Sequence, residues 1–340
     1  IPVESEHSAM SACVGASASG ARAMTATCSQ GLAYMWEIVY IASAMRLPIV
    51  MPVVNRALSA PINIHCDHSD SMGARDSGWI QIYCENGQEA YESTILAVRI
   101  AEDEKILLPV MVCFDGFITS HAVERIELLD DKVVKDWVGE RKAKYSLLDV
   151  ENPLTYGPLD LQDYYFEHKR QEAEAMRNAY SAIPGIMDKF ERVVGKRYDY
   201  LEEYKMDGAE LAVLCLSSTC GTARTAVDHL REKGIKAGMV KFRFFRPFPA
   251  REVVESLSRA KAVAILDRSD TFSNRGGPVF NEIRSAFYEN ENKPLIVNYI
   301  YGLGGRDINI DDIEKVYGDL EKILKQKKVE TLVNYLGVRE

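Results

Sequence analysis

Several apolar runs in this sequence have no polar face to present to water. They include PIVMPVV (48–54), ILLPVMVCF (106–114), AELAVLCLS (209–217) and AVAILD (262–267). Their length and their content of β-branched residues are typical of buried strands. A strand that is apolar on both faces must be covered on both faces, as happens in parallel sheets with crossover helices. The runs therefore predict an α/β fold.

Segments with helical spacing alternate with these runs in two separate stretches of the chain. In the first stretch we expect a strand at 21–27 and a continuous helix at 31–46. In the second stretch we expect one strand at 237–245 and a charged helical tail from Ile313 onward. Both stretches show the strand-then-helix order of a parallel sheet, so each predicts a domain of its own.

The sequence between these two stretches breaks the alternation. It contains the loop PLTYGPLD (153–160) and, at 163–195, a charged sequence that predicts one or two amphipathic helices. We therefore expect two parallel-sheet α/β domains with a helical linker between them, with boundaries at 1–150, 151–207 and 208–340.

The composition excludes several classes of function. The 340 residues are 47% hydrophobic and 27% charged, and the formal net charge is -9 with a pI near 5.4. A nucleic-acid surface needs a basic excess that no stretch here supplies. Apolar runs of about 20 residues, which a membrane-spanning helix requires, are also missing from the sequence. We expect a cytoplasmic protein that binds neither nucleic acid nor membrane. Because the chain starts on IPVES without Met, we also expect an upstream segment.

The seven cysteines do not form a metal-binding pattern. They are scattered through apolar or small-residue segments, as in reduced cytosolic proteins. Cys215 and Cys220 are the closest pair and have no second half, so any iron-sulfur cluster must be held by another chain. The loop HCDHSD (65–70) carries two histidines and two aspartates, but its spacing favours turns and local hydrogen bonds. We expect no metal on this chain.

Polar loops follow the strands of the first stretch, and they should meet at one edge of the sheet. The loops are CSQG (28–31), NRALSAPINIHCDHSD (55–70), ENGQ (85–88) and DGFITSH (115–121). Ligands of parallel sheets bind where loops leave the carboxyl ends of strands. Helix capping and turn formation are the structural alternative. Arg56 follows a buried strand, so its guanidinium either binds a carboxylate ligand or forms an internal salt bridge.

Two loops of the second stretch are also candidates for binding or pairing. YGLGGRD (301–307) is glycine-rich and could direct backbone N–H groups toward an anion. It lacks the GxGxxG spacing and follows the last strand, which disfavours a nicotinamide site. In LDRSD, we expect Asp267 and Arg268 to pair with each other.

Taken together, several loops resemble one known family. The alpha chains of the pyruvate:ferredoxin oxidoreductases, members of the 2-oxoacid:ferredoxin oxidoreductase family, contain similar segments in the same order along essentially the whole chain. The segments are SEHSAMSACVGAS (5–17), TATCSQGL (25–32), NRALS (55–59), DHSD (67–70), FDGFITSH (114–121), FRFFRPFP (242–249), LDRS (266–269) and GLGGRD (302–307).

The resemblance implies an incomplete thiamin site. In the family, thiamin diphosphate lies between this chain's first domain, of the pyrimidine-binding type, and a beta chain that supplies the diphosphate and Mg²⁺ contacts. The second domain is similar to the C-terminal domain of transketolase. The resemblance further implies beta, gamma and delta partner chains, [4Fe-4S] clusters on partner chains, ferredoxin as electron acceptor, coenzyme A as co-substrate and a 2-oxoacid substrate. The family's chain also has an upstream segment with a YPITP-like loop.

The resemblance implies roles for individual residues. Glu6 matches the carboxylate that hydrogen-bonds the thiamin pyrimidine ring and activates the cofactor, and Arg56 matches the arginine that binds the 2-oxoacid carboxylate. Ser29, Gln30 and Asp115 fall in loops that match the cofactor-binding edge.

Alternatives to these roles stay open at this point. Glu6 can be a purely structural charge at a helix N-terminus. The substrate can be pyruvate, 2-oxoglutarate, a branched 2-oxoacid or oxalate, and the chain can instead be a non-catalytic assembly subunit or a nucleotide-dependent oxidoreductase.

Overall fold

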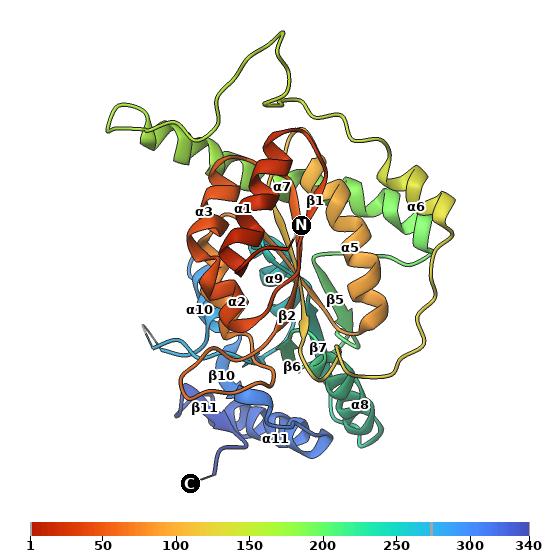
Figure 1. Cartoon of the computed structure of the whole chain (residues 1–340). Coiled ribbons are helices and arrows are strands. Elements are labelled where there is room, and N and C mark those ends of the chain that lie inside the picture. The colour runs from red at the N-terminus through yellow and green to blue at the C-terminus, as the bar shows by residue number, and fades with distance from the viewer. Residues whose placement is uncertain (1, 273–274, 340) are drawn as a thin grey trace.

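The chain forms two α/β domains, each with its own sheet (Figure 1). The computed structural model describes residues 2–272 and 275–339. The strand order is β1-β2-β4-β3-β8 in the first sheet and β11-β10-β9-β6-β7-β5 in the second. All pairs are parallel except β3 with β8 and β5 with β7. The predicted α/β fold is confirmed, and each sheet ends in one antiparallel edge strand.

The first sheet is covered on both faces, as its apolar strands require. Odd and even residues of a strand face opposite sides, so Ile49, Met51 and Val53 of β2 pack with α1 to α3 while Val50 packs with α5 and α7. The elements of this half are α1 (Glu6–Ala18), β1 (Ala23–Met24), α2 (Ser29–Tyr34), α3 (Trp36–Ala44), β2 (Ile49–Asn55), α4 (Ser69–Gly73), a 3₁₀ turn (Ala74–Asp76), β3 (Ile80–Cys84), α5 (Gly87–Glu102), β4 (Val110–Asp115), α6 (Asp131–Val138) and α7 (Tyr165–Val194).

The second sheet is covered in the same way. Its residues Leu211 and Val213 pack with α8 and α11, and Ala212 and Leu214 belong to the core that contains α9 and α10. The elements of this half of the chain, of which β8 belongs to the first sheet, are β5 (Leu201–Tyr204), β6 (Leu211–Cys215), α8 (Thr219–Glu232), β7 (Ala237–Phe242), β8 (Phe244–Arg246), α9 (Ala250–Leu257), β9 (Ala262–Asp267), α10 (Pro278–Ala286), β10 (Leu295–Tyr301), a 3₁₀ turn (Leu303–Gly305), α11 (Ile310–Gln326) and β11 (Val333–Leu336).

The predicted strand at 237–245 is divided between the two sheets. β7 pairs with β6 and β5 in the second sheet, whereas β8 pairs with β3 in the first. The chain crosses at Arg243, whose backbone N–H donates to the Tyr200 carbonyl and whose carbonyl accepts from the Tyr83 N–H. Apolar composition could not reveal this, because residues 242, 244 and 245 are all buried phenylalanines.

Three other expected elements differ in detail. The predicted helix at 31–46 breaks at Met35, where α2 ends and α3 begins. The predicted strand at 21–27 is reduced to β1 and an isolated bridge from Thr27 to Val53. The tail continues beyond α11 into β11, which pairs with β10.

The linker contains both a long helix and a strand of the second sheet. α7 begins at Tyr165, and β5 lies between α7 and residue 208. Before α7, the segment from 117 to 164 is mostly irregular and crosses the top of the first domain (Figure 1).

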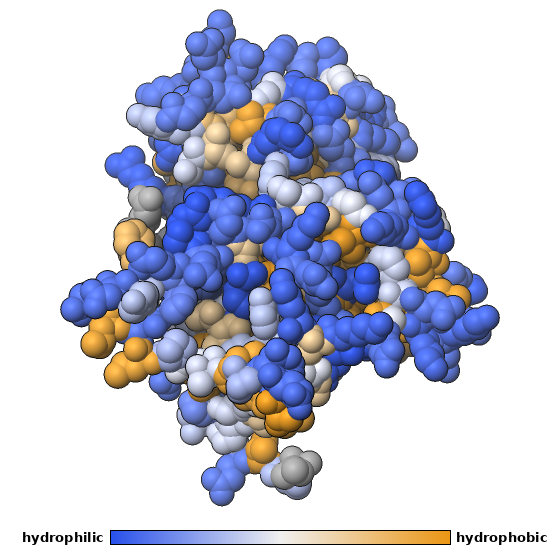
Figure 2. Space-filling model, turned by 90° about the horizontal axis from the view of Figure 1, so that it is seen from above, coloured by the Kyte–Doolittle hydropathy of each residue, from blue (hydrophilic) through white to orange (hydrophobic). Residues whose placement is uncertain are grey.

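Seen from above, hydrophobic patches interrupt a mostly hydrophilic face (Figure 2). The exposed large apolar side chains of the segment 117–164 are Phe117, Ile118, Val123, Ile126, Leu128, Val133, Tyr145, Leu147, Leu148, Val150, Leu159, Leu161 and Tyr164. Within the described ranges, no helix is both long enough and apolar enough to span a bilayer.

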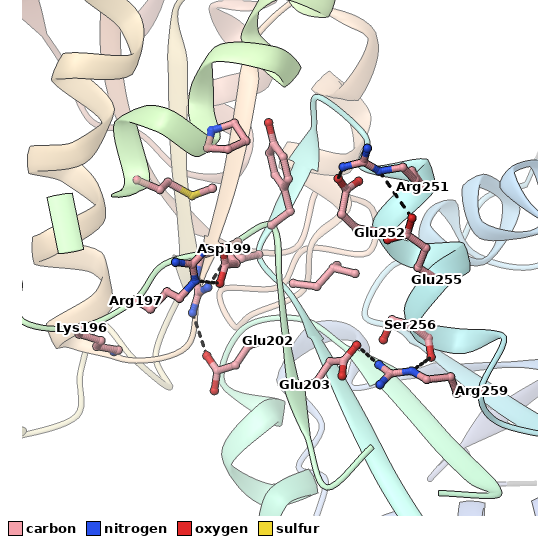
Figure 3. Close-up of a pocket in the computed structure, with 15 residues that line it drawn as sticks. Lys196, Arg197, Asp199, Glu202, Glu203, Arg251, Glu252, Glu255, Ser256 and Arg259 are labelled. Carbon is pink, nitrogen blue, oxygen red and sulfur yellow. Dashed lines mark hydrogen bonds and ion pairs between the residues drawn. The ribbon is translucent and has the colours of Figure 1, made fainter. Parts of the chain in front are cut away.

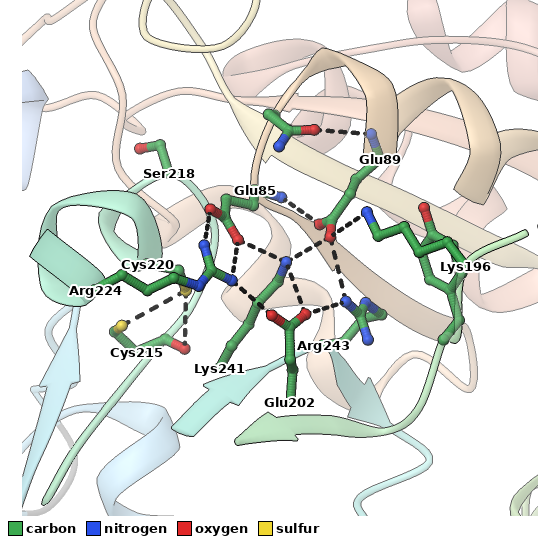
Figure 4. A network of polar contacts seen from close by, with 12 residues as sticks. Glu85, Glu89, Lys196, Glu202, Cys215, Ser218, Cys220, Arg224, Lys241 and Arg243 are labelled. Atoms are coloured by element: carbon green, nitrogen blue, oxygen red, sulfur yellow. Dashed lines mark hydrogen bonds and ion pairs between the residues drawn. The ribbon is translucent and has the colours of Figure 1, made fainter. Parts of the chain in front are cut away.

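A buried network of charges joins the two domains (Figure 4). Lys241 of β7 donates to Glu85 (2.7 Å) and to Glu89 (2.5 Å) of the first domain, and its side chain is 1% exposed. Arg243 donates to Glu89 (3.2 Å) and to Glu202 (2.9 Å), while Arg224 forks onto Glu85. Since each buried charge has an opposite partner, the network fixes the domain arrangement by the penalty for separating the pairs.

This network predicts a loss of stability in acid. Burial would raise the pKa of Glu89, but Arg243 and Lys241 outweigh it and hold the pKa at about 2, against an ordinary 4.5. A depressed pKa contributes stability above the unfolded-state value, and the contribution is lost as the pH falls toward 2. We expect the free energy of unfolding in urea to fall by up to about 3 kcal/mol between pH 4.5 and 2 through this group.

Glu89→Gln should remove this part of the pH dependence, so the difference between wild type and variant measures it. Glu174→Gln is the control, because Glu174 pairs with Arg170 and Arg177 on the exposed surface of α7. Identical acid slopes for wild type and Glu89→Gln would contradict the assignment.

Candidate functional site

The first sheet brings the predicted site residues to one edge. Because β1, β2 and β4 are parallel, their carboxyl ends lie on the same side of the sheet. Ser29 and Gln30 begin the helix after β1, Arg56 follows β2 directly, and Asp115 is the last residue of β4. Glu6 reaches this edge from the first turn of α1.

Glu6 lies against the start of α2. Ser5 caps α1 by accepting a hydrogen bond from the Ser8 N–H, which leaves Glu6 as the first helical residue with an exposed side chain. A Cβ added at Gly31 would lie 3.0 Å from Glu6 Cγ and 2.5 Å from Thr27 Oγ1. The glycine therefore makes room for the carboxylate at this edge. As the acidic residue in the first turn of α1, Glu6 also interacts favourably with the positive end of the helix dipole.

Ser29 and Gln30 form a hydrogen-bonded corner. Ser29 is buried, has a left-handed φ of 46° and donates its hydroxyl to the Ala57 carbonyl (2.6 Å). Gln30 is exposed and donates from Nε2 to Ser59 Oγ (2.9 Å). Both residues thus tie the loop after β1 to the loop after β2.

Arg56 has no carboxylate partner among residues 2–272 and 275–339. Its Nε is buried without a hydrogen-bond partner in that part of the chain. Of the two interpretations left open by the sequence, the internal salt bridge is therefore not found within the described residues. A buried guanidinium nitrogen that lacks a partner is costly unless a ligand supplies one.

Asp115 is engaged between the domains. Its side chain is fully buried, and its oxygens contact His68 Nε2 (2.7 Å), Arg268 Nη1 (2.9 Å) and Ser218 Oγ (2.5 Å). Burial would raise the pKa of Asp115, but Arg268 and His68 hold it well below the usual range. These contacts favour an inter-domain role for Asp115 over the predicted cofactor contact.

The expected pair of Asp267 and Arg268 does not form. Arg268 pairs with Asp115, whereas Asp267 accepts hydrogen bonds from the Val279 and Phe280 N–H groups at the start of α10. Burial raises the pKa of Asp267 to about 7. Neighbouring residues of a strand point to opposite faces, which explains why the two side chains take different partners.

The glycine-rich loop of the second domain holds the loop that follows Arg56. The Gly304 N–H donates to Asp67 Oδ2 (3.3 Å), and the Gly305 N–H donates to the Cys66 carbonyl (2.6 Å). Asn63 Nδ2 donates to the Gly304 carbonyl (3.1 Å). The loop does present an N–H group to an anion, and that anion is a carboxylate of the first domain.

Cys66, His68 and Asp115 lie close enough together to resemble a metal site. Arg268 occupies one oxygen of Asp115 at 2.9 Å, so a cation there would meet a positive charge. Burial raises the pKa of the Cys66 thiol well above its usual value, which opposes the thiolate form that a metal needs. The donor set therefore fits an ion-pair network better than a metal.

A large cavity lies away from this edge. It measures about 1040 Å³ and is lined by α7, β5 and α9 (Figure 3). Charged side chains of its wall are paired with one another, for example Arg197 with Asp199 (2.6 Å) and Arg251 with Glu252 (2.9 Å). The residues predicted from the sequence are not part of this wall. We therefore place the candidate site at the carboxyl edge of the first sheet.

The structure adds two residues to the site that sequence reasoning missed. From the sequence, Asp70 belongs to the loop 55–70 and to the segment DHSD without a predicted role, and its buried carboxylate accepts hydrogen bonds from the backbone N–H groups of Ser29 and Arg56. Gly31 makes room for Glu6. For Gly31, the position directly after CSQ was the only available signal. For Asp70, the residues themselves do not indicate a contact with Ser29 or Arg56.

Known proteins match this chain over its full length. Residues 1–188 match the family model "Pyruvate flavodoxin/ferredoxin oxidoreductase, thiamine diP-bdg", and residues 209–313 match "Pyruvate:ferredoxin oxidoreductase core domain II". The pyruvate synthase subunit PorA of Thermotoga maritima is 55% identical over 340 residues, which is 100% of this chain and 86% of the relative. PorA of Pyrococcus furiosus is 44% identical over 339 residues (100% and 85%). The ketoisovalerate oxidoreductase subunit VorA of Pyrococcus abyssi is 40% identical over 340 residues (100% and 85%).

Solved structures show the same fold at low sequence identity. The 2-oxoglutarate:ferredoxin oxidoreductase from Magnetococcus marinus, with 2-oxoglutarate, coenzyme A and succinyl-CoA bound, superposes with a TM-score of 0.67 at 20% identity. The match covers 94% of this chain and 56% of that chain. A split-gene transketolase, an inactive beta4 tetramer, gives a TM-score of 0.56 at 14% identity and covers 96% and 83%.

Gly305→Ala tests the contact between the glycine-rich loop and the first domain. Gly305 has a φ of 79°, and an added Cβ would lie 2.3 Å from His65 Cβ. Gly234→Ala is a matched control, because Gly234 has a φ of 80° and nothing within 4 Å of an added Cβ. The control should lose about 1 kcal/mol of unfolding free energy from backbone strain. Gly305→Ala should lose clearly more, as measured by urea unfolding, and equal losses would contradict the contact.

Proposed function

Because this chain belongs to the pyruvate flavodoxin/ferredoxin oxidoreductase family, we propose that it is the alpha subunit of a multi-subunit pyruvate:ferredoxin oxidoreductase. The enzyme would oxidatively decarboxylate pyruvate with coenzyme A to acetyl-CoA and CO₂, and pass the electrons to ferredoxin. Pyruvate is favoured as substrate because the relatives named pyruvate synthase are 55% and 44% identical, against 40% for the ketoisovalerate enzyme.

The observation that carries this proposal is the pair of side chains at one sheet edge. Glu6 presents an exposed carboxylate beside Gly31, and Arg56 presents a guanidinium without a protein partner in the described part of the chain. A thiamin pyrimidine ring needs a carboxylate at its ring nitrogen, and a 2-oxoacid needs a cation at its carboxylate. The residues of this edge fit both requirements.

Each residue of the site would have a defined task. When bound, thiamin diphosphate supplies the nucleophile and the electron sink for decarboxylation. Glu6 would accept a hydrogen bond from the pyrimidine ring and hold a proton there. Arg56 would bind and orient the 2-oxoacid carboxylate through charge-assisted hydrogen bonds. Ser29 and Gln30 would line the cofactor edge, since they lie directly before Gly31.

Other parts of the reaction would be supplied by partner chains. We place the diphosphate and Mg²⁺ contacts on a beta chain and the [4Fe-4S] clusters on partner chains of the same complex, which would also include gamma and delta chains. The seven cysteines of this chain are all free and scattered, which supports this division. We place the protein in the cytoplasm, since free thiols are typical of proteins in a reducing environment.

A branched 2-oxoacid is the second candidate substrate. It is supported by the 40% identity to a ketoisovalerate oxidoreductase subunit over the whole chain. Measuring kcat/KM of the assembled enzyme for pyruvate and for 2-oxoisovalerate separates the two. A higher kcat/KM for the branched acid would replace pyruvate as the assigned substrate.

Glu6→Gln tests the thiamin site. An amide cannot take up the proton that the carboxylate holds, so we expect kcat of the assembled enzyme to fall about 100- to 10,000-fold. Exchange of the thiamin C2 hydrogen with deuterium should slow in parallel. Glu4→Gln is the matched control, because Glu4 is exposed and lies outside α1. Exchange at the wild-type rate in a correctly assembled Glu6→Gln enzyme would refute the role.

Arg56→Ala tests the substrate site. Hydrogen bonds between charged groups contribute about 1.5 to 3 kcal/mol each, so KM for pyruvate should rise at least about 10-fold, with thiamin binding retained. Arg125→Ala is the control, because the Arg125 side chain is 89% exposed and pairs only with Glu127 in the described structure. An unchanged KM in Arg56→Ala would remove this arginine from the site.

A further inference from the structure

We propose that Asp70 is a positioning residue that holds the cofactor loop at Ser29 and the substrate-binding Arg56 in fixed relation to each other. The proposal deepens the function proposed above and rests on it. It concerns a buried carboxylate that acts through two backbone N–H groups.

The Asp70 carboxylate joins the ends of two neighbouring strands. Its side chain is 1% exposed. Oδ2 accepts from the Ser29 N–H (2.9 Å) and from the Arg56 N–H (3.0 Å). Oδ1 accepts from Asn55 Nδ2 (2.7 Å) and from the Ser71 N–H (2.7 Å). The Oδ2 atom of Asp70 therefore connects Ser29, the first residue of α2, with Arg56, the first residue after β2.

The backbone at Ser29 depends on this contact. Ser29 has a φ of 46°, in the left-handed region that is unfavourable for a non-glycine residue. Such a conformation persists only where surrounding contacts enforce it. The Asp70 carboxylate receives the Ser29 N–H, and the Ser29 hydroxyl reaches the Ala57 carbonyl at 2.6 Å. The two bonds fix the direction in which α2 starts, and with it the position of Gly31 beside Glu6.

The backbone at Arg56 is fixed from the same point. Its N–H is directed to Asp70, and the next residue, Ala57, donates its own N–H to the His65 carbonyl (2.9 Å). The guanidinium, by contrast, has no partner among the described residues for its buried Nε. The main chain of Arg56 is thus held rigidly while the side chain stays available for a ligand.

Asp70→Asn cannot satisfy these contacts. Each carboxylate oxygen receives two hydrogen bonds, and an amide of the same shape replaces one of those oxygens with an NH₂ group. In one orientation the NH₂ group faces the N–H groups of Ser29 and Arg56. In the other it faces Asn55 Nδ2 and the Ser71 N–H. In the first case the Ser29 and Arg56 N–H groups lose their acceptor. In the second case the Ser71 N–H loses its acceptor, while the Asn55 amide can turn over and present its Oδ1 to the new NH₂ group. Either the two loops or the start of α4 must therefore shift.

The test uses the assembled enzyme with Asp70→Asn. A displacement of about 1 Å at a substrate-positioning group can cost about 100-fold, so we expect KM for pyruvate to rise about 10- to 100-fold. We also expect the dissociation constant of thiamin diphosphate for the cofactor-free complex, followed by fluorescence quenching, to rise about 10-fold. The second measurement does not depend on turnover.

Asp267→Asn is the matched control. Asp267 is also 1% exposed, also accepts backbone N–H bonds and lies at the end of β9 in the second domain. Both variants should lower the melting temperature, but only Asp70→Asn should raise KM and weaken thiamin binding. Equal KM and thiamin affinity in the two variants would reduce Asp70 to a structural carboxylate and overturn the proposal.

If Asp70→Asn does not fold, Asp70→Glu answers the same question, because it keeps both acceptor oxygens and moves them by one methylene. It should raise KM while the free energy of unfolding changes less. Wild-type KM in Asp70→Glu would overturn the proposal. Failure of the proposed function is a separate result: it would show in wild-type behaviour of Glu6→Gln and Arg56→Ala, whereas failure of the positioning role leaves those two variants impaired.

Discussion

The placement of the two domains depends on buried ion pairs between them, and the carboxylate of Asp115, at the end of β4, forms one of the two groups of such contacts. This carboxylate binds Arg268 and Ser218 of the second domain and His68 of the first, without exposure to water. Removing one partner would leave a buried charge uncompensated, a loss of about 3 to 5 kcal/mol in comparable pairs. Arg268 also donates to the Gly302 carbonyl of the glycine-rich loop, and this loop binds the segment after Arg56. The second domain therefore supports the shape of the site residues that the first domain contributes.

Much of the fold could be predicted from the sequence, because its central strands are apolar on both faces. Runs such as 48–54 and 106–114 specified parallel strands between helices, and the loops specified the family, which the comparisons confirm. The crossing at Arg243 could not be predicted, because the residues that bind the Arg243 side chain there, Glu89 and Glu202, are distant in sequence. β5 could not be predicted either. Its sequence, LEEY, lacks the apolar composition of the central strands, because β5 is an edge strand that pairs only with β7.

The candidate site divides in the same way. Glu6, Ser29, Gln30 and Arg56 were predicted together, and the structure places them at one sheet edge, while their roles stay proposals. Asp70 could not be identified, because an aspartate in a polar loop looks the same in sequence whether it caps a turn or joins two strands. Asp115 was predicted as a cofactor-binding residue, and two of its three partners, Arg268 and Ser218, come from the other domain, which periodicity cannot reveal.

The crossing of the chain at Arg243 also constrains how the protein can be synthesised. β3, five fully buried residues, receives its outer neighbour only from β8, some 160 positions later in the chain. On the ribosome, the first sheet therefore stays open along this border until Arg246 has emerged. An open apolar border is a template for pairing with other chains. A nascent chain that ends before this point therefore exposes the unpaired border of β3.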